Sequence, residues 1–322
     1  MKIGKMKIIV TESENFSPQA FEVLSTIGQV LLLDIKSRQE LMEQCIDADI
    51  LFVRLGFKID SEIIDRLPNL KYILSATTGT DHLDEDHFKA KGGKVVCLKG
   101  ETEFLGSIPS TAEHTWALLL SLIKKVPSSF EHVKSGGWNR NLFKGNNLRG
   151  KRIGILGMGR VGMQVAKFAT AFEMEIGFFD TAEKNVDYQK FDTAEKMFSW
   201  SEIICIHIPL NKENENFVDE KLLNFANEEC LLINTSRGNV WDEKIVAEKI
   251  LKAEISGVAT DVLQNELDLD VLINSPLTDL ANKGYNVIMT PHIAGATFES
   301  MAMTEKFIAD KMILELASDT SN

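Results

Sequence analysis

Residues 151–180 constrain the fold most strongly, because a glycine-rich turn lies between two short apolar runs. The first run, Arg152–Leu156, has the length and composition of a buried strand, and glycines follow at 157, 159 and 162. The second run, Ile176–Phe179, ends on Asp180. Between them, apolar side chains recur at helical spacing: Val161, Val165, Phe168, Ala169 and Phe172. This order of strand, glycine turn, helix, strand and acid predicts a dinucleotide-binding βαβ unit.

The three glycines have different physical tasks in such a unit. Gly157 permits the tight turn, Gly159 lets the backbone approach a pyrophosphate, and Gly162 allows close contact between helix and strand. The helix N-terminus offers unpaired N–H groups to the phosphates. Asp180 can accept hydrogen bonds from both hydroxyls of the adenine ribose and would repel a 2′-phosphate, so we expect NAD rather than NADP. Glycines alone also mark ordinary turns, and the flanking strands and acid favour the dinucleotide interpretation.

Size and charge narrow the class of protein. A chain of 322 residues most simply forms two domains, and its 44% hydrophobic and 25% charged residues are ordinary for a globular protein. The net charge of −12 has no basic block, which argues against nucleic acid or an anionic membrane as partner. No apolar run suits a signal peptide or a membrane span, so a cytoplasmic protein with reduced cysteines is expected. No His, Cys and Asp cluster has the spacing of metal ligands, so no metal is expected.

Residues 7–98 alternate short apolar runs with amphipathic ones. This alternation predicts a parallel sheet with helices on both faces, and ligands in such sheets bind at the carboxyl ends of the strands. Helices are expected to begin after Ser17 and after Ser37, whose Glu40 completes a capping box. The predicted strands are Lys7–Val10, Gln29–Leu33, Ile50–Arg54, Lys71–Ala76 and Lys94–Leu98.

The middle of the chain is predicted to connect two domains. Residues 99–109 lose their periodicity and are interpreted as a linker, after which Ser110 and Glu113 form a further capping box. The helix that follows, with the run 116–123, is apolar nearly all round and must be buried between domains or against a second subunit. We therefore expect a homodimer contact there. Residues 136–150 are predicted to be a loop, and the amphipathic segment 298–316 is expected to pack back on the first domain.

Four later strands are each followed by polar residues that would face the dinucleotide. They end in His207-Ile208-Pro209, Thr235-Ser236-Arg237, Asp261 and His292. Arginine can hold a carboxylate by two parallel hydrogen bonds, and histidine can transfer the proton that accompanies a hydride. A carboxylate such as Glu266 would stabilise the protonated ring. Alternatives remain: Arg54 in a surface salt bridge, His207 in packing, His292 as a structural residue, and Glu243, Asp268 or Asp270 as the acid.

These motifs together resemble the D-isomer-specific 2-hydroxyacid dehydrogenase family, nearest its phosphoglycerate dehydrogenase-like branch without the regulatory domain. The similarity rests on GMGRVG at 157–162, HIPL at 207–210, NTSRG at 234–238, Thr260-Asp261-Val262 and PHIAG at 291–295, with Thr78-Gly79-Thr80-Asp81 and Ala112-Glu113-His114 earlier in the chain. It implies a Rossmann NAD-binding domain at 106–291, inserted into a flavodoxin-like substrate domain at 1–105 and 292–322.

The resemblance also implies roles for individual residues. Arg237, Glu266 and His292 would be catalytic, and Arg54, Leu55 and Gly79 would face the carboxylate of a small 2-hydroxy or 2-keto acid. The expected cofactor contacts are Thr78, Gly157, Gly159, Arg160, Val161, Gly162, Asp180, His207, Ile208, Pro209, Thr235, Ser236, Asp261 and Gly295.

Departures from the family pattern limit what the resemblance says about substrate. Ser75 stands where phosphoglycerate-using members tend to carry arginine, which argues against a phosphorylated substrate, and Leu267 replaces a usual proline after Glu266. Leu55 replaces a small or polar residue in the pocket wall. Two other functions remain open: an NAD(H)-sensing binding protein of corepressor type with little turnover, and an enzyme acting on formate or an oxyanion of phosphorus.

Overall fold

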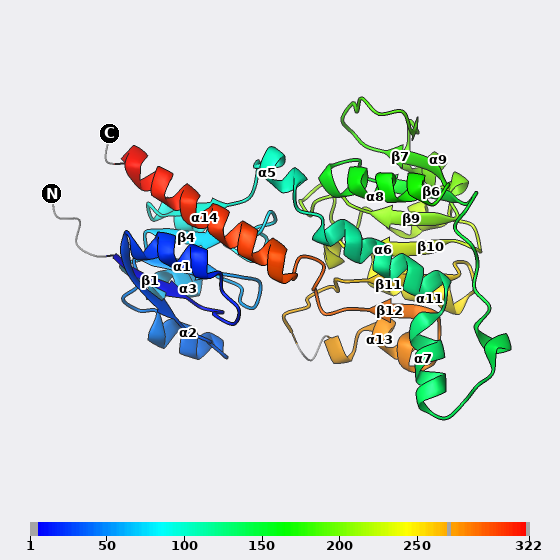
Figure 1. Ribbon diagram of the computed structural model, residues 1–322, viewed down its shortest axis with the longest axis horizontal. Coiled ribbons are helices and arrows are strands. Elements are labelled where there is room, and N and C mark those ends of the chain that lie inside the picture. The colour runs from blue at the N-terminus through cyan, green and yellow to red at the C-terminus, as the bar shows by residue number, and fades with distance from the viewer. Residues whose placement is uncertain (1–5, 269–271, 320–322) are drawn as a thin grey trace. The chain divides into compact units, whose positions relative to one another are not determined.

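The computed structural model describes residues 6–268 and 272–319, which form two compact units (Figure 1). Unit 1 consists of the residues up to Ser107 together with those from Ala296 on, and unit 2 runs from Ile108 to Gly295. The boundaries lie a few residues from the predicted 105/106 and 291/292. Among the described residues, no helix is long and apolar enough to cross a membrane.

Unit 1 has a five-stranded parallel sheet in the order β2-β1-β3-β4-β5, the flavodoxin-like order that was predicted. The central strands β3 and β4 are buried along their whole length, as expected for a sheet covered on both faces. The strands are β1 (Met6–Val10), β2 (Gly28–Leu32), β3 (Ile50–Val53), β4 (Tyr72–Ser75) and β5 (Lys94–Cys97). The helices are α1 (Pro18–Ser25), α2 (Arg38–Gln44), α3 (Ser61–Arg66), α4 (Glu85–Ala90), α5 (Thr102–Gly106) and α14 (Phe298–Asp319).

The helix ends of unit 1 follow the predicted capping chemistry in part, since the Glu40 carboxylate accepts the N–H of Lys36 at 2.8 Å rather than that of Ser37. The Ser17 hydroxyl accepts from the Ala20 N–H at 3.3 Å, and the Ser37 hydroxyl accepts from the Glu40 N–H at 3.1 Å. Helix α14 packs against α1, β4 and β5, which confirms that the closing segment returns to the first unit. The predicted linker at 99–109 was wrong in part, because residues 102–106 form α5.

Unit 2 has a seven-stranded parallel sheet in the order β12-β11-β10-β9-β6-β7-β8, which is the Rossmann order with an added edge strand. Its strands are β6 (Arg152–Leu156), β7 (Glu175–Phe179), β8 (Gln189–Lys190), β9 (Ile203–Ile206), β10 (Leu231–Asn234), β11 (Gly257–Thr260) and β12 (Val287–Met289). Its helices are α6 (Ser110–Ile123), α7 (Val126–Lys134), α8 (Arg160–Ala171), α9 (Ala194–Trp200), α10 (Glu220–Leu223), α11 (Glu243–Leu251) and α13 (Pro276–Asn282), with 3₁₀ turns η1 (Arg140–Phe143) and η2 (Gly238–Val240). The predicted doubly wound α/β fold is confirmed.

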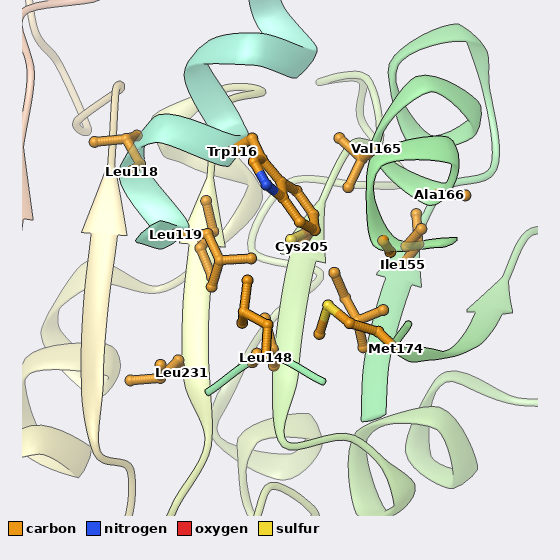
Figure 2. Close-up of a cluster of buried hydrophobic side chains, with 14 of the residues drawn as sticks. Trp116, Leu118, Leu119, Leu148, Ile155, Val165, Ala166, Met174, Cys205 and Leu231 are labelled. Carbon is orange, nitrogen blue, oxygen red and sulfur yellow. The ribbon is translucent and has the colours of Figure 1, made fainter. Parts of the chain in front are cut away.

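The apolar helix α6 is buried within unit 2 itself. It packs against α8, β10 and β11, and Trp116 and Leu119 belong to one buried cluster with Val165 of α8 and Cys205 of β9 (Figure 2). Its burial therefore needs no second subunit. The capping box at Ser110 was wrong: Ser110 lies inside the helix, and its buried hydroxyl finds no hydrogen-bond partner among the described residues.

Candidate functional site

The glycine turn joins β6 to the first turn of α8. Gly157 has φ +94°, where a side chain would be strained, and an added Cβ would lie 2.7 Å from the carbonyl oxygen of His207. A Cβ at Gly162 would lie 2.3 Å from the Gly157 carbonyl oxygen, so helix and turn touch closely there. At Gly159, the N-cap of α8, a Cβ would meet no atom within 4 Å. Packing therefore does not explain that glycine, and the open space fits a pyrophosphate against the helix N-terminus.

Asp180 is fixed beside this turn at the end of β7. One carboxylate oxygen accepts the Met158 N–H at 2.9 Å and the other accepts the Ala182 N–H at 2.8 Å. The Lys184 ammonium lies 3.5 Å away. The carboxylate is thus held next to the glycine turn, where a ribose would be recognised.

His207 follows β9, and its backbone N–H donates to the Leu156 carbonyl at 2.8 Å. Its ring Nε2 is buried and has no hydrogen-bond partner among the described residues. Burial, together with the nearby Arg160 guanidinium, lowers the pKa of His207 to about 3. The ring is therefore neutral near neutral pH and is not suited to proton transfer there.

Asn234 ties together the loops that follow β10 and β11. Its side-chain amide donates to the Arg237 carbonyl at 3.0 Å and its oxygen accepts the Ser236 N–H at 3.0 Å. Its backbone carbonyl accepts the Asp261 N–H at 2.9 Å. Beside it, the Thr235 hydroxyl is buried and lies 2.7 Å from that of Thr115. The turn that carries Arg237 is therefore held from both sides.

Asp261, after β11, holds the loop that follows β12. Its carboxylate accepts the Ile293 N–H at 2.9 Å, the Ala294 N–H at 2.7 Å and the Thr290 hydroxyl at 2.5 Å. His114 of α6 lies 3.3 Å from the same carboxylate and 2.9 Å from the Thr290 hydroxyl. Burial would raise the pKa of Asp261, but these hydrogen bonds outweigh it and hold the pKa below its usual value.

His292 is contacted by Glu266, whose Oε1 is hydrogen-bonded to His292 Nδ1. The other Glu266 oxygen accepts the Leu263 N–H at 3.2 Å, which orients the carboxylate. His292 has φ +54°, an uncommon conformation for a side chain other than glycine, and its N–H donates to the Asp261 carbonyl at 2.9 Å. The ring is 21% exposed and Glu266 is 28% exposed, so the pair is reachable from solvent.

The other acids near Glu266 in sequence have different surroundings. Glu243 is buried and accepts hydrogen bonds from the Ser275 hydroxyl and the Gln264 N–H. Asp268 is exposed, and Asp270 lies outside the described residues. Glu266 is therefore the acid that partners His292.

The remaining predicted site residues fall in both units. In unit 2, the Arg237 guanidinium is half-buried and donates to the Ser236 carbonyl at 2.8 Å. Arg160, at the start of α8, donates to the Ile108 carbonyl at 3.3 Å. In unit 1, Thr78 is exposed and the Gly79 carbonyl accepts the Thr77 hydroxyl at 2.7 Å. Arg54 is ion-paired with Glu305. Val161, Leu55 and Ile208 are half-buried, and Pro209 and Gly295 are exposed.

Sequence reasoning missed the residues that hold this site in place. Asn234 and Thr290 lie at strand ends beside predicted residues, and their polar side chains were the available signal. The contact of His114 with Asp261 could not be read from the sequence. In the described part of the chain, no group of three or more His, Cys, Asp or Glu side chains is placed to hold a metal ion.

The fold and this geometry define a Rossmann-type dinucleotide-binding protein with a histidine–carboxylate pair. Residues 116–294 match the D-isomer specific 2-hydroxyacid dehydrogenase, NAD binding domain. The chain is 32% identical to glyoxylate reductase from Thermofilum pendens, over 88% of this chain and 83% of that protein. The chain belongs to the D-isomer specific 2-hydroxyacid dehydrogenase family.

Two further comparisons show how much of this chain and of each similar protein is matched. It is 30% identical to D-3-phosphoglycerate dehydrogenase from Methanocaldococcus jannaschii over 98% of this chain, but spans only 59% of that protein. D-lactate dehydrogenase from Aquifex aeolicus, solved with NAD and lactic acid, superposes with a TM-score of 0.83 at 25% identity, over 98% of this chain and 96% of that one.

Proposed function

We propose that the protein interconverts a D-2-hydroxy acid and its 2-keto acid with NAD as cofactor. The observation that carries the proposal is the His292–Glu266 pair, anchored through Asp261 at the same carboxyl edge of the parallel sheet as the family's NAD-binding turn. A protein that only senses NAD(H) has no need of a solvent-accessible imidazole oriented by a carboxylate, so the pair favours an enzyme. Unit 2 is proposed to bind the nucleotide, and unit 1 to be the substrate domain.

Each member of the site has a proposed task. The Arg237 guanidinium binds and polarises the substrate by charge-assisted hydrogen bonds to its carboxylate. In the reducing direction, protonated His292 donates a proton to the carbonyl oxygen, and in the oxidising direction its neutral ring accepts the hydroxyl proton. Glu266 fixes the ring orientation through its hydrogen bond to Nδ1. Bound NAD(H) supplies the hydride chemistry.

The residues around the glycine turn would hold that cofactor. The backbone of residues 157–162 and the N-terminus of α8 suit the pyrophosphate, and Asp180 suits the ribose hydroxyls. His207 follows β9 and Asp261 follows β11, at the same carboxyl edge of the sheet as the glycine turn. The other residues proposed to line the cofactor are Thr78, Arg160, Val161, Ile208, Pro209, Thr235, Ser236 and Gly295.

The test offers a panel of 2-keto acids to the purified chain with NADH or with NADPH and follows loss of the reduced cofactor's absorbance. We expect turnover of at least one acid, with NADH preferred because Asp180 would repel a 2′-phosphate. In Asp180→Ser, the preference for NADH should fall by about tenfold or more, which corresponds to about 1.4 kcal/mol. Asp187→Ser, an exposed acid later in the same loop, is the control and should keep the preference.

A lack of turnover with every acid, alongside tight NADH binding, would contradict the proposed reaction and favour the sensing function. Formate and phosphite belong in the same panel as donors with NAD. If only formate or only phosphite reduces NAD, the substrate is not a 2-hydroxy acid, and the enzyme acts on a different class of substrate.

We propose that two copies form a homodimer through α7 and the segment after it. None of the side chains of α7 is buried, and large apolar groups are exposed there: Val126 50%, Phe130 62%, Val133 48%, Trp138 89% and Leu142 57%. Large apolar side chains exposed close together in the sequence favour association. Sedimentation should give twice the chain mass. The double variant Phe130→Ser, Trp138→Ser should dissociate into monomers at a higher protein concentration than the parent does. Leu314→Ser, equally exposed on α14, should behave like the parent, and a monomeric parent would refute the dimer.

A further inference from the structure

Arg54 follows β3 at the carboxyl edge of the unit 1 sheet, and its guanidinium is held by Glu305. Arg54 Nε and Nη2 donate to Glu305 Oε1 at 3.0 and 2.6 Å. Its Nη1 donates to the Glu14 carbonyl at 2.8 Å. All three nitrogens of the Arg54 guanidinium thus have hydrogen-bond partners within unit 1. An anionic ligand would have to compete with these partners.

Glu305, the ion-pair partner of this arginine, is a buried residue of α14. It is 1% exposed, on the inner face of α14, and its Oε2 accepts the Ser17 N–H at the start of α1 at 2.8 Å. Burial raises the pKa of Glu305, and the Ser17 N–H and the Arg54 guanidinium oppose that rise. Separating the pair would leave a buried charge without its partner, which is costly.

The neighbouring strand ends offer no substitute for this charge. The Glu12 carboxylate accepts the N–H groups of Arg54 and Gly56 at 2.8 and 3.0 Å, so another acid lies at the base of the Arg54 loop. At the end of β4, Ser75 is fully buried and hydrogen-bonded to Thr77 at 2.8 Å and His82 at 3.3 Å. Where β3 and β4 end, the positive charge of Arg54 is therefore compensated, and Ser75 adds none.

We propose that Glu305 determines substrate specificity: by neutralising Arg54, it restricts the enzyme to 2-keto acids whose side chain carries no phosphate or second carboxylate. The inference rests on the proposed function, because it concerns the acid that this dehydrogenase would reduce. Because Arg54 is paired with Glu305, it offers no uncompensated cation to a second anionic group. Glyoxylate, pyruvate and hydroxypyruvate have the required chemistry.

The experiment compares pairs of acids that differ mainly in one charged group. Hydroxypyruvate is paired with its 3-phosphate, and 2-ketobutyrate with oxaloacetate. The parent protein should have the higher kcat/KM for the uncharged member of each pair. Glu305→Gln keeps the side-chain shape and an acceptor for the Ser17 N–H but removes the charge. It should raise kcat/KM at least about tenfold for the charged members, mainly through KM, because a charge-assisted hydrogen bond becomes available.

Two further variants separate specificity from general damage. Adding Arg54→Gln to Glu305→Gln should cancel the gain on the charged acids. Glu62→Gln, which likewise neutralises a carboxylate paired with an arginine, here Arg38 at 2.7 Å on the surface, should leave the selectivity of the parent unchanged. Melting temperatures confirm that each variant is folded. A parent that prefers the charged acids, or a Glu305→Gln protein with parental selectivity, would overturn the inference.

Failure of the proposed reaction can be told apart from failure of this inference. If no keto acid is reduced, calorimetric binding of 3-phosphoglycerate and D-lactate in the presence of NADH replaces kinetics. Glu305→Gln should then bind 3-phosphoglycerate at least about tenfold more tightly than the parent does. Equal affinities for the two proteins would reject the role of Glu305, whatever the reaction.

Discussion

Replacing His292 by alanine is expected to lower kcat by roughly 10²–10⁴-fold while NADH affinity stays close to that of the parent. The ring is the group proposed to transfer the substrate proton, and its loss leaves only water for that task. Its backbone is held separately, by the bond from its N–H to the Asp261 carbonyl at 2.9 Å, so the loop should keep its shape. Steady-state kinetics on the best keto acid and fluorescence titration with NADH measure the two effects.

The matched control for this variant is His87→Ala. His87 also pairs with a carboxylate, Asp65 at 2.9 Å, but on the exposed helices of unit 1. It should leave kcat unchanged. Parental turnover in the His292 variant would remove the imidazole from the mechanism, and loss of NADH binding would show that it serves the cofactor instead.

Replacing Arg237 by methionine is expected to lower kcat/KM by roughly two to three orders of magnitude. Removing one partner of a close charge pair costs about 2–5 kcal/mol, and each 1.4 kcal/mol is a factor of ten. Arg237→Lys keeps the charge but loses the planar fork, so it should recover only part of the activity. The loss should be seen in KM and in kcat, because the guanidinium is proposed both to bind and to polarise the substrate.

Arg149→Lys provides the comparison for Arg237. Arg149 pairs with Glu173 at 2.7 Å on the surface of unit 2, where an exchange of cations should have little effect. If Arg237→Lys and Arg237→Met both keep the parental kcat/KM, the substrate carboxylate is bound elsewhere. The proposed reaction could then survive only with a different anchoring residue.

The fold was predictable because its signals are local and repeated. Buried parallel strands are short apolar runs, and each predicted strand lies on an observed one, as with Ile50–Val53 and Arg152–Leu156. The errors occur where packing overrides local pattern. Ser110 has the sequence of a cap, yet it is the first residue of the helix, and its hydroxyl is buried. Helix α5 has only five residues and no side-chain cap, so little in its sequence marks it.

From the sequence, the candidate site could be proposed as a set of residue types at strand ends, but its contacts could not be predicted. The partnership of Glu266 with His292 depends on a loop that brings together residues 26 positions apart. Arg54 and Glu305 are 251 positions apart in the sequence, and no local pattern at either residue predicts their pairing. Contacts between distant residues are set by the tertiary fold, which a single sequence does not display.

Unit 1 is built from two separate parts of the chain, and this has a consequence for biosynthesis. On the ribosome, the strands of its sheet emerge first, but α14, which packs on α1, β4 and β5, emerges after the whole of unit 2. Because domains fold as their residues become available, the continuous unit 2 can mature while the earlier sheet still lacks one of its covering helices. Arg54 thus acquires its counter-charge only after unit 2 has been synthesised.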